Sequence, residues 1–157
     1  MQLSSLFESM ANSHVAHTIT GSSYLVGLLS SVHMLGLMLI VGSSVVVCLR
    51  SFRLLLPDQP LADVMRPAGR AVLLGLSISV VTGLLMFTPR AVSASENPVF
   101  QTKMLLVAAA ILFQFTLFRF VARSGGNPAL WRILSGALGA ALWFAVGFYG
   151  VLFTVFE

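Results

Sequence analysis

One histidine, His33, lies inside a long apolar run from Ser22 to Arg50 that carries no charged residue before the arginine at its end. The hydrocarbon core of a bilayer is about 30 Å thick, and about 20 apolar helical residues cross it at roughly 1.5 Å each. The run is therefore predicted to span a membrane. An ionisable group at that depth is costly and usually faces a cavity, a neighbouring helix or a cofactor. His33 is consequently the first candidate for chemistry.

Five further polar side chains fall in or beside the other apolar runs: Lys103, Arg90, Gln114, His14 and His17. A neutral imidazole is a good axial ligand for haem iron, and the two haem propionates favour lysine or arginine near the membrane interface. These residue types predict a b-haem site with His33 as axial ligand and with Lys103 and Arg90 near the propionates. His17 or His14 is then the candidate for the second iron ligand. Gln114 shares a helical face with Lys103, which favours an inward, polar-lined side of that span.

Two other interpretations use the same residues. Met34 and Met38 follow His33 at helical spacing, and thioether and imidazole groups suit Cu(I), so copper is an alternative metal. Methionine also fills irregular gaps in ordinary packing. In the structural interpretation, His33 hydrogen-bonds a serine or threonine of a neighbouring helix, Gln114 makes a similar interhelical bond, and the long Lys103 side chain reaches the headgroups. His14 and His17 are then simply solvated.

Composition places these residues in an integral membrane protein. The 157-residue chain is 57% hydrophobic and 9% charged, whereas a soluble domain carries about a quarter charged residues. A single cysteine, Cys48, excludes an intramolecular disulfide and a cysteine-based metal cluster. No basic block is long enough to indicate nucleic acid, and we expect the lipid bilayer as the main partner. The five acidic residues lie in loops or at helix ends, which argues against a carboxylate proton relay.

The elements that must position the candidates are four spans, predicted at about residues 22–50, 70–87, 99–121 and 130–156. Short connections between them predict an all-α, antiparallel four-helix bundle that forms one membrane domain over residues 1–157. Residues 2–17 are too polar to cross a bilayer and predict an amphipathic helix in the interface. Small residues at helical spacing predict close helix approach, within the bundle, to a second copy or to another membrane subunit. They are Gly75, Ser79 and Gly83 in the second span and Ser135, Gly139 and Gly147 in the fourth.

Basic residues predict the orientation, because lysine and arginine near span ends favour the cytoplasmic side. Only Arg90 and Lys103 belong to the other side, and the N-terminal segment has neither residue type. This predicts both termini on the outer side of the membrane, which for a bacterial inner membrane is the periplasm, and all three histidines in the outer half of the molecule. The seven arginines of the first-to-second and third-to-fourth connections are Arg50, Arg53, Arg66, Arg70, Arg119, Arg123 and Arg132.

Two motifs resemble a known family layout. The stretch Val32-His33-Met34-Leu35-Gly36, continuing through Gly42, and the stretch from Asn97 to Leu105 resemble a family of small four-span bacterial inner-membrane proteins. That family is similar in layout to the CopD copper-resistance proteins and the HemJ-type protoporphyrinogen oxidases. The resemblance implies haem b binding or porphyrin oxidation, with His33 and Lys103 as the matching site residues.

The chain departs from that pattern in two places. Where relatives often have a second histidine late in the third span, it has Phe118 and Arg119, and where they often have arginine after the last glycine, it has Val151. The usual second ligand of such a site is therefore missing. Four functions remain open: a b-haem-binding or redox-associated protein, a cofactor-free accessory subunit of a larger membrane complex, a copper-handling protein, and an enzyme that acts on a porphyrin.

Overall fold

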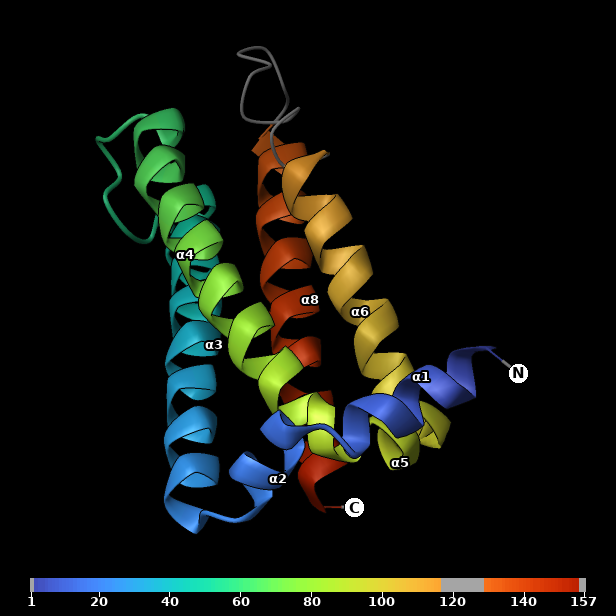
Figure 1. Ribbon diagram of the computed structural model, residues 1–157. Coiled ribbons are helices and arrows are strands. Elements are labelled where there is room, and N and C mark those ends of the chain that lie inside the picture. Colours follow the sequence, from blue (N-terminus) through green and yellow to red (C-terminus); the bar gives the residue numbers. More distant parts are fainter. Residues whose placement is uncertain (1, 117–128, 156–157) are drawn as a thin grey trace.

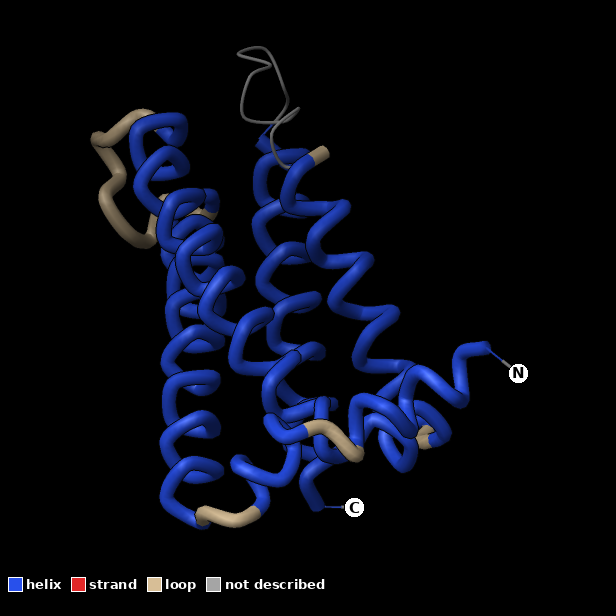
Figure 2. The backbone as a smooth tube through the Cα atoms, viewed as in Figure 1, coloured by secondary structure: helices blue, strands red, loops and turns tan. Residues whose placement is uncertain are grey.

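The computed structural model describes residues 2–116 and 129–155, and every regular element in these ranges is helical (Figure 2). Four long helices run alternately up and down: α3 (Ser23–Ser51), α4 (Leu61–Phe87), α6 (Pro98–Phe115) and α8 (Ala129–Val155). Three shorter helices, α1 (Gln2–Ala11), α2 (His14–Thr20) and α5 (Ala91–Glu96), gather with the 3₁₀ turn η1 (Thr88–Arg90) at one end of the bundle (Figure 1). The predicted all-α antiparallel bundle is confirmed.

The bundle consists of two helix pairs. α3 packs most extensively against α4, α6 packs against α8, and the contact between α3 and α8 joins the pairs. The buried core between them is small and apolar, and it is formed by Ile40, Val72, Ala110, Trp143 and Val146. Many other large apolar side chains are exposed, as expected where lipid replaces water around the protein.

Small residues set the closest approach, between α3 and α4. A Cβ at Gly36 would lie 2.5 Å from Oγ of Ser79 and 2.9 Å from the carbonyl oxygen of Gly75. A Cβ at Gly75 would lie 2.5 Å from the carbonyl oxygen of Gly36. The predicted close packing of the second span is therefore present, and it serves the contact with α3 of the same chain.

The N-terminal segment differs from the expected single helix over residues 2–17, because it forms two helices. The Ser13 hydroxyl accepts a hydrogen bond from the backbone N–H of Ala16 at 3.2 Å and so starts α2 as its N-cap. A serine in this role competes with helix continuation, which ends α1 at Ala11. Both helices lie across the end of the bundle (Figure 1), in agreement with the interfacial position predicted for them.

The second span also begins earlier than predicted, at Leu61 rather than near residue 70. Pro60 is the N-cap of α4, and Pro67 lies inside the helix. A proline removes one backbone hydrogen bond, and near the start of a helix the freed carbonyl can be solvated. The connection after Phe87 is helical as well, as η1 and α5, where a polar loop was expected. The predicted end of the third span and the two arginines 119 and 123 fall outside the described residues.

Candidate functional site

His33 points from α3 onto α4 and is half-buried there. Its Nδ1 lies 3.0 Å from Oγ1 of Thr82. The ring also packs against Gly83, where a Cβ would lie 3.3 Å from Cε1 of His33. The predicted contact of His33 with a serine or threonine of a neighbouring helix is confirmed, and the glycine in the next position makes room for the ring.

The hydrogen bonds of Thr82 assign the proton on the imidazole. The Thr82 hydroxyl lies 2.7 Å from the carbonyl oxygen of Ile78, which can only accept, so the hydroxyl proton points there. The oxygen of Thr82 therefore accepts from Nδ1–H of His33. With the proton on Nδ1, Nε2 of the neutral ring carries the lone pair with which an imidazole binds a metal. The ring also interacts with the backbone of Ser79. A ligand histidine whose other nitrogen donates a hydrogen bond in this way is the usual arrangement in metal sites.

Lys103 reaches the same depth from α6. Its half-buried side chain extends to α8, where a Cβ at Gly150 would lie 3.5 Å from Nζ and 3.6 Å from Cε of Lys103. His33 and Lys103 are close enough to interact electrostatically. The two residues that the sequence motifs singled out thus lie within electrostatic range of each other, one in each helix pair.

An aromatic cluster lies one turn further toward the end of the bundle that carries α1 and α2. The ring of Phe87 stacks on Phe100 with centroids 5.3 Å apart, and Phe100 contacts Phe153 at 5.3 Å. Phe7 of α1 meets Phe87 edge-on at 6.0 Å. Phe87 and Phe153 come four and three residues after Gly83 and Gly150 on α4 and α8. Phe100 comes three residues before Lys103 on α6, which runs in the opposite direction, so all three rings lie on the same side of the His33–Lys103 site and cover it from that end.

The other predicted site residues lie elsewhere. Arg90 ends η1 and is exposed, and His14 and His17 are exposed on α2, which packs against η1 and α3. They share the end of the bundle with the His33–Lys103 site. In the described ranges, no three histidine, cysteine, aspartate or glutamate side chains form a metal-binding group. The Met34 and Met38 side chains of the copper interpretation are exposed.

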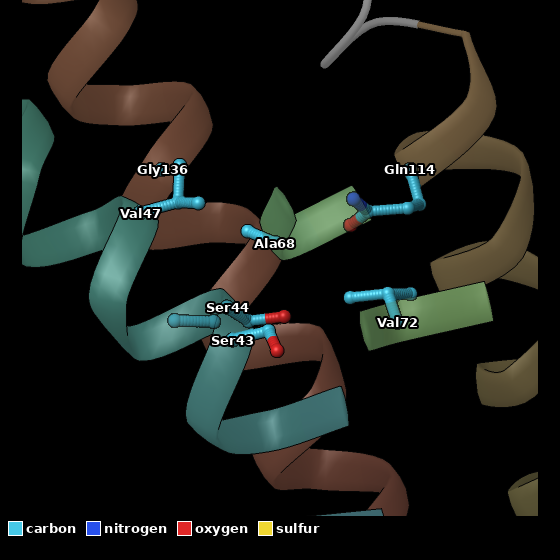
Figure 3. A pocket seen from close by; sticks show the side chains of 9 residues that line it. Ser43, Ser44, Val47, Ala68, Val72, Gln114 and Gly136 are labelled. Carbon is cyan, nitrogen blue, oxygen red and sulfur yellow. The ribbon is translucent and has the colours of Figure 1, made fainter. Parts of the chain in front are cut away.

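Gln114 belongs to a separate cavity. It lies eleven residues, or about 16 Å of helix, beyond Lys103 on α6. Its amide points from α6 toward the hydroxyls of Ser43 and Ser44 on α3 (Figure 3). The cavity between them measures about 10 Å³, room for about one water molecule. Gln114 is therefore placed to make a polar contact between helices, at the other end of the bundle from His33.

Sequence reasoning missed Thr82 and Gly83 as parts of the site. Gly83 had been identified only as a small residue that allows close packing, and Thr82 stands beside it. The sequence did contain a signal for them, because Thr82 carries a hydroxyl and stands next to Gly83, the last of three small residues at helical spacing. A hydroxyl at such a position on a facing helix can reach a buried histidine. Pairing the two positions needed the register of α3 against α4, which only the structure gives.

The fold and composition define a multi-pass helical membrane protein, because four of the described helices are long and apolar enough to cross a bilayer. The chain belongs to a family of unknown function, DUF6644, whose family model matches residues 7–153 and so includes the whole site. No curated protein and no solved structure matches the chain. The resemblance to CopD-type and HemJ-type proteins stays a prediction.

Proposed function

We propose that this protein binds haem b in the membrane, with His33 as an axial iron ligand and Lys103 beside a propionate, and that it takes part in electron transfer. The observation that carries the proposal is the hydrogen bond between His33 and Thr82. It holds the imidazole in the tautomer whose Nε2 is free, which is the form that ligates iron.

The charge of the site supports an anionic group on the ligand. A lysine at this depth is costly unless a negative charge or several polar groups face it. None of the helices α3, α6 and α8 contains a carboxylate, and the single carboxylate of α4, Asp63, is in its first turn at the opposite end. The other carboxylates of the described helices, Glu8 of α1 and Glu96 of α5, belong to short helices outside the four long ones. A haem propionate would supply a negative charge between the long helices. Arg90, at the same end of the bundle, is the candidate partner for the second propionate.

The surrounding side chains fit a porphyrin in a second respect. The aromatic cluster of Phe7, Phe87, Phe100 and Phe153 separates the site from the interface and keeps its surroundings apolar. Haem b, when bound, supplies one-electron redox chemistry. The protein's own contribution is to orient the imidazole, to place a cation beside it and to limit access of water, which together set the redox potential.

The accessory-subunit hypothesis receives less support from the packing. Its sequence basis was the set of small residues on the second and fourth spans. Gly75, Ser79 and Gly83 are occupied by α3 of the same chain, and Gly139 packs against Phe113 of α6. Most of these positions are thus used inside the bundle, whereas a Cβ at Gly147 would meet no atom within 4 Å. The copper hypothesis is likewise less supported, because the methionines near His33 have exposed side chains.

An absorption spectrum tests the proposal. Protein expressed with a haem precursor and purified in detergent should show a Soret band that shifts on reduction. His33→Ala should abolish the band, and Met34→Ala, which changes the next residue with an exposed side chain, should leave it intact. Wild-type protein without a Soret band, or a band unchanged in His33→Ala, would overturn the proposal. In the haem-bound protein, His14→Ala and His17→Ala then identify whether either residue is the second ligand.

A further inference from the structure

We propose that a groove between α3 and α4, at the arginine-rich end of the bundle, binds one anionic phospholipid. The acyl chain would lie along the groove and the phosphate would meet Arg50 and Arg53. The groove has a volume of about 440 Å³ and is apolar except for one serine. It lies far from the His33–Lys103 site, so this binding is independent of haem.

The floor of the groove is a row of residues spaced four apart on α3, inclined to the helix axis. Met38, Gly42 and Val46 line it, and Arg50 follows one turn later on the same face. From Met38 to Arg50 the row is about 18 Å long, comparable to an extended acyl chain. A Cβ at Gly42 would meet no atom within 4 Å, so the glycine leaves open space in the middle of the floor. On α4, Pro67 and Ala71 form the opposite wall.

The α3–α4 loop closes the groove at its charged end. Arg50 donates from Nε to the carbonyl oxygen of Gln59 at 2.8 Å and makes a second, short hydrogen bond to the same oxygen. This folds the loop back over the end of α3 and brings Leu56 into the groove lining. Arg53 and Leu56 adopt left-handed backbone conformations, with φ of 60° and 49°, which reverse the chain there. A guanidinium has five N–H groups, so Arg50 retains donors for a phosphate.

Charge favours an anionic lipid over a second copy of the chain. Residues 50–70 contain four arginines and two aspartates, a net charge of two positive. Basic pockets between helices at such an end of a membrane protein bind anionic headgroups. A second copy packed in parallel on the same groove would place another set of these arginines beside the first, which is unfavourable. The groove also opens on the lipid-facing side, where Met38 is 67% exposed.

Native mass spectrometry of the detergent-purified chain tests the site, with phosphatidylglycerol and phosphatidylcholine of identical acyl chains as probes. Gly42→Leu should fill the groove and weaken phosphatidylglycerol binding about ten-fold or more. Gly27→Leu is the matched control, because it changes the same helix at a position where a Cβ also meets nothing within 4 Å. Arg53→Gln should reduce the preference for phosphatidylglycerol over phosphatidylcholine by about five-fold.

Three results would overturn the proposal. The first is equal lipid affinity in Gly42→Leu and Gly27→Leu. The second is a dimer of the wild type that Gly42→Leu converts to a monomer without any change in lipid binding, which would assign the groove to a second copy. The third is equal binding of both lipids by the wild type, because the arginines would then not select an anionic headgroup. Because Arg53→Gln alters only an exposed loop side chain, it remains informative if Gly42→Leu does not fold.

Discussion

Replacing Gly36 by alanine tests the close approach of α3 and α4, on which the position of His33 depends. The added methyl group would lie 2.5 Å from Oγ of Ser79, a hydroxyl that is buried without a hydrogen-bond partner among the described atoms. It would also lie 2.9 Å from the backbone carbonyl oxygen of Gly75. The hydroxyl can rotate away, but the carbonyl belongs to the helix and cannot. The two helices must therefore separate locally.

The expected loss follows from two opposing effects. Overpacking a well-packed contact costs about 1–3 kcal/mol, and a clash with backbone belongs at the upper end of that range. Alanine gains about 1 kcal/mol over glycine in a helix interior. The net loss in free energy of unfolding is then about 2 kcal/mol, roughly a thirty-fold change in the folding equilibrium. His33 is one turn from Gly36 and Thr82 is one turn from Ser79, so separation there also lengthens the His33–Thr82 hydrogen bond.

Chemical unfolding of the detergent-purified variants measures the loss, and the Soret absorbance per protein reports the effect on the site. Gly42→Ala is the matched control on α3, since its Cβ meets nothing within 4 Å. It should be as stable as the wild type, or up to about 1 kcal/mol more stable. Equal stability of Gly36→Ala and Gly42→Ala would contradict a close approach of α3 and α4 at Gly36. The position of His33 would then not depend on that approach.

Substitutions at three further positions, Thr82, Lys103 and Phe100, test the site itself. Thr82→Val removes the acceptor for Nδ1–H of His33 and should lower haem affinity about 10–100-fold, whereas Thr82→Ser should restore it; haem titration measures both. Lys103→Gln should weaken haem binding in the same titration, and Lys103→Arg should retain most of it; equal loss in both would contradict a role for the charge. Phe100→Ala removes a stacked contact with Phe87 and a tilted contact with Phe153, and it should lower the free energy of unfolding by about 3 kcal/mol. Phe7→Ala, which removes one edge contact, should cost less.

The sequence was sufficient for the long helices because each is an apolar run of a length that fits a bilayer. The first span was predicted at residues 22–50 and is observed at Ser23–Ser51. The sequence did not predict local structure that depends on a single hydrogen bond between a side chain and the backbone. The hydroxyl of Ser13, which divides the N-terminal segment, and the carbonyl of Gln59, which folds the loop onto Arg50, act through side chain–backbone bonds that hydropathy does not register.

For the site, the sequence identified His33 and Lys103 because polar groups are conspicuous in apolar spans. It could not decide which helix His33 faces, and hence which of its nitrogens carries the proton. It also grouped Gln114 with Lys103 on the basis of a shared helical face. A shared face is not a shared depth, and three turns of helix separate the two side chains. Gln114 therefore faces Ser43 and Ser44 in its own small cavity (Figure 3).

The residues of the site come from both helix pairs. His33 and Thr82 belong to the α3–α4 pair, and Lys103 and Gly150 belong to the α6–α8 pair. A ligand held by both His33 and Lys103 would bridge pairs that are otherwise joined mainly by α3 and α8. Because a ligand that binds only the folded state stabilises it by mass action, bound haem should raise the unfolding midpoint of the bundle. The rise should vanish in His33→Ala, which separates a cofactor that holds the bundle together from one that only associates with its surface.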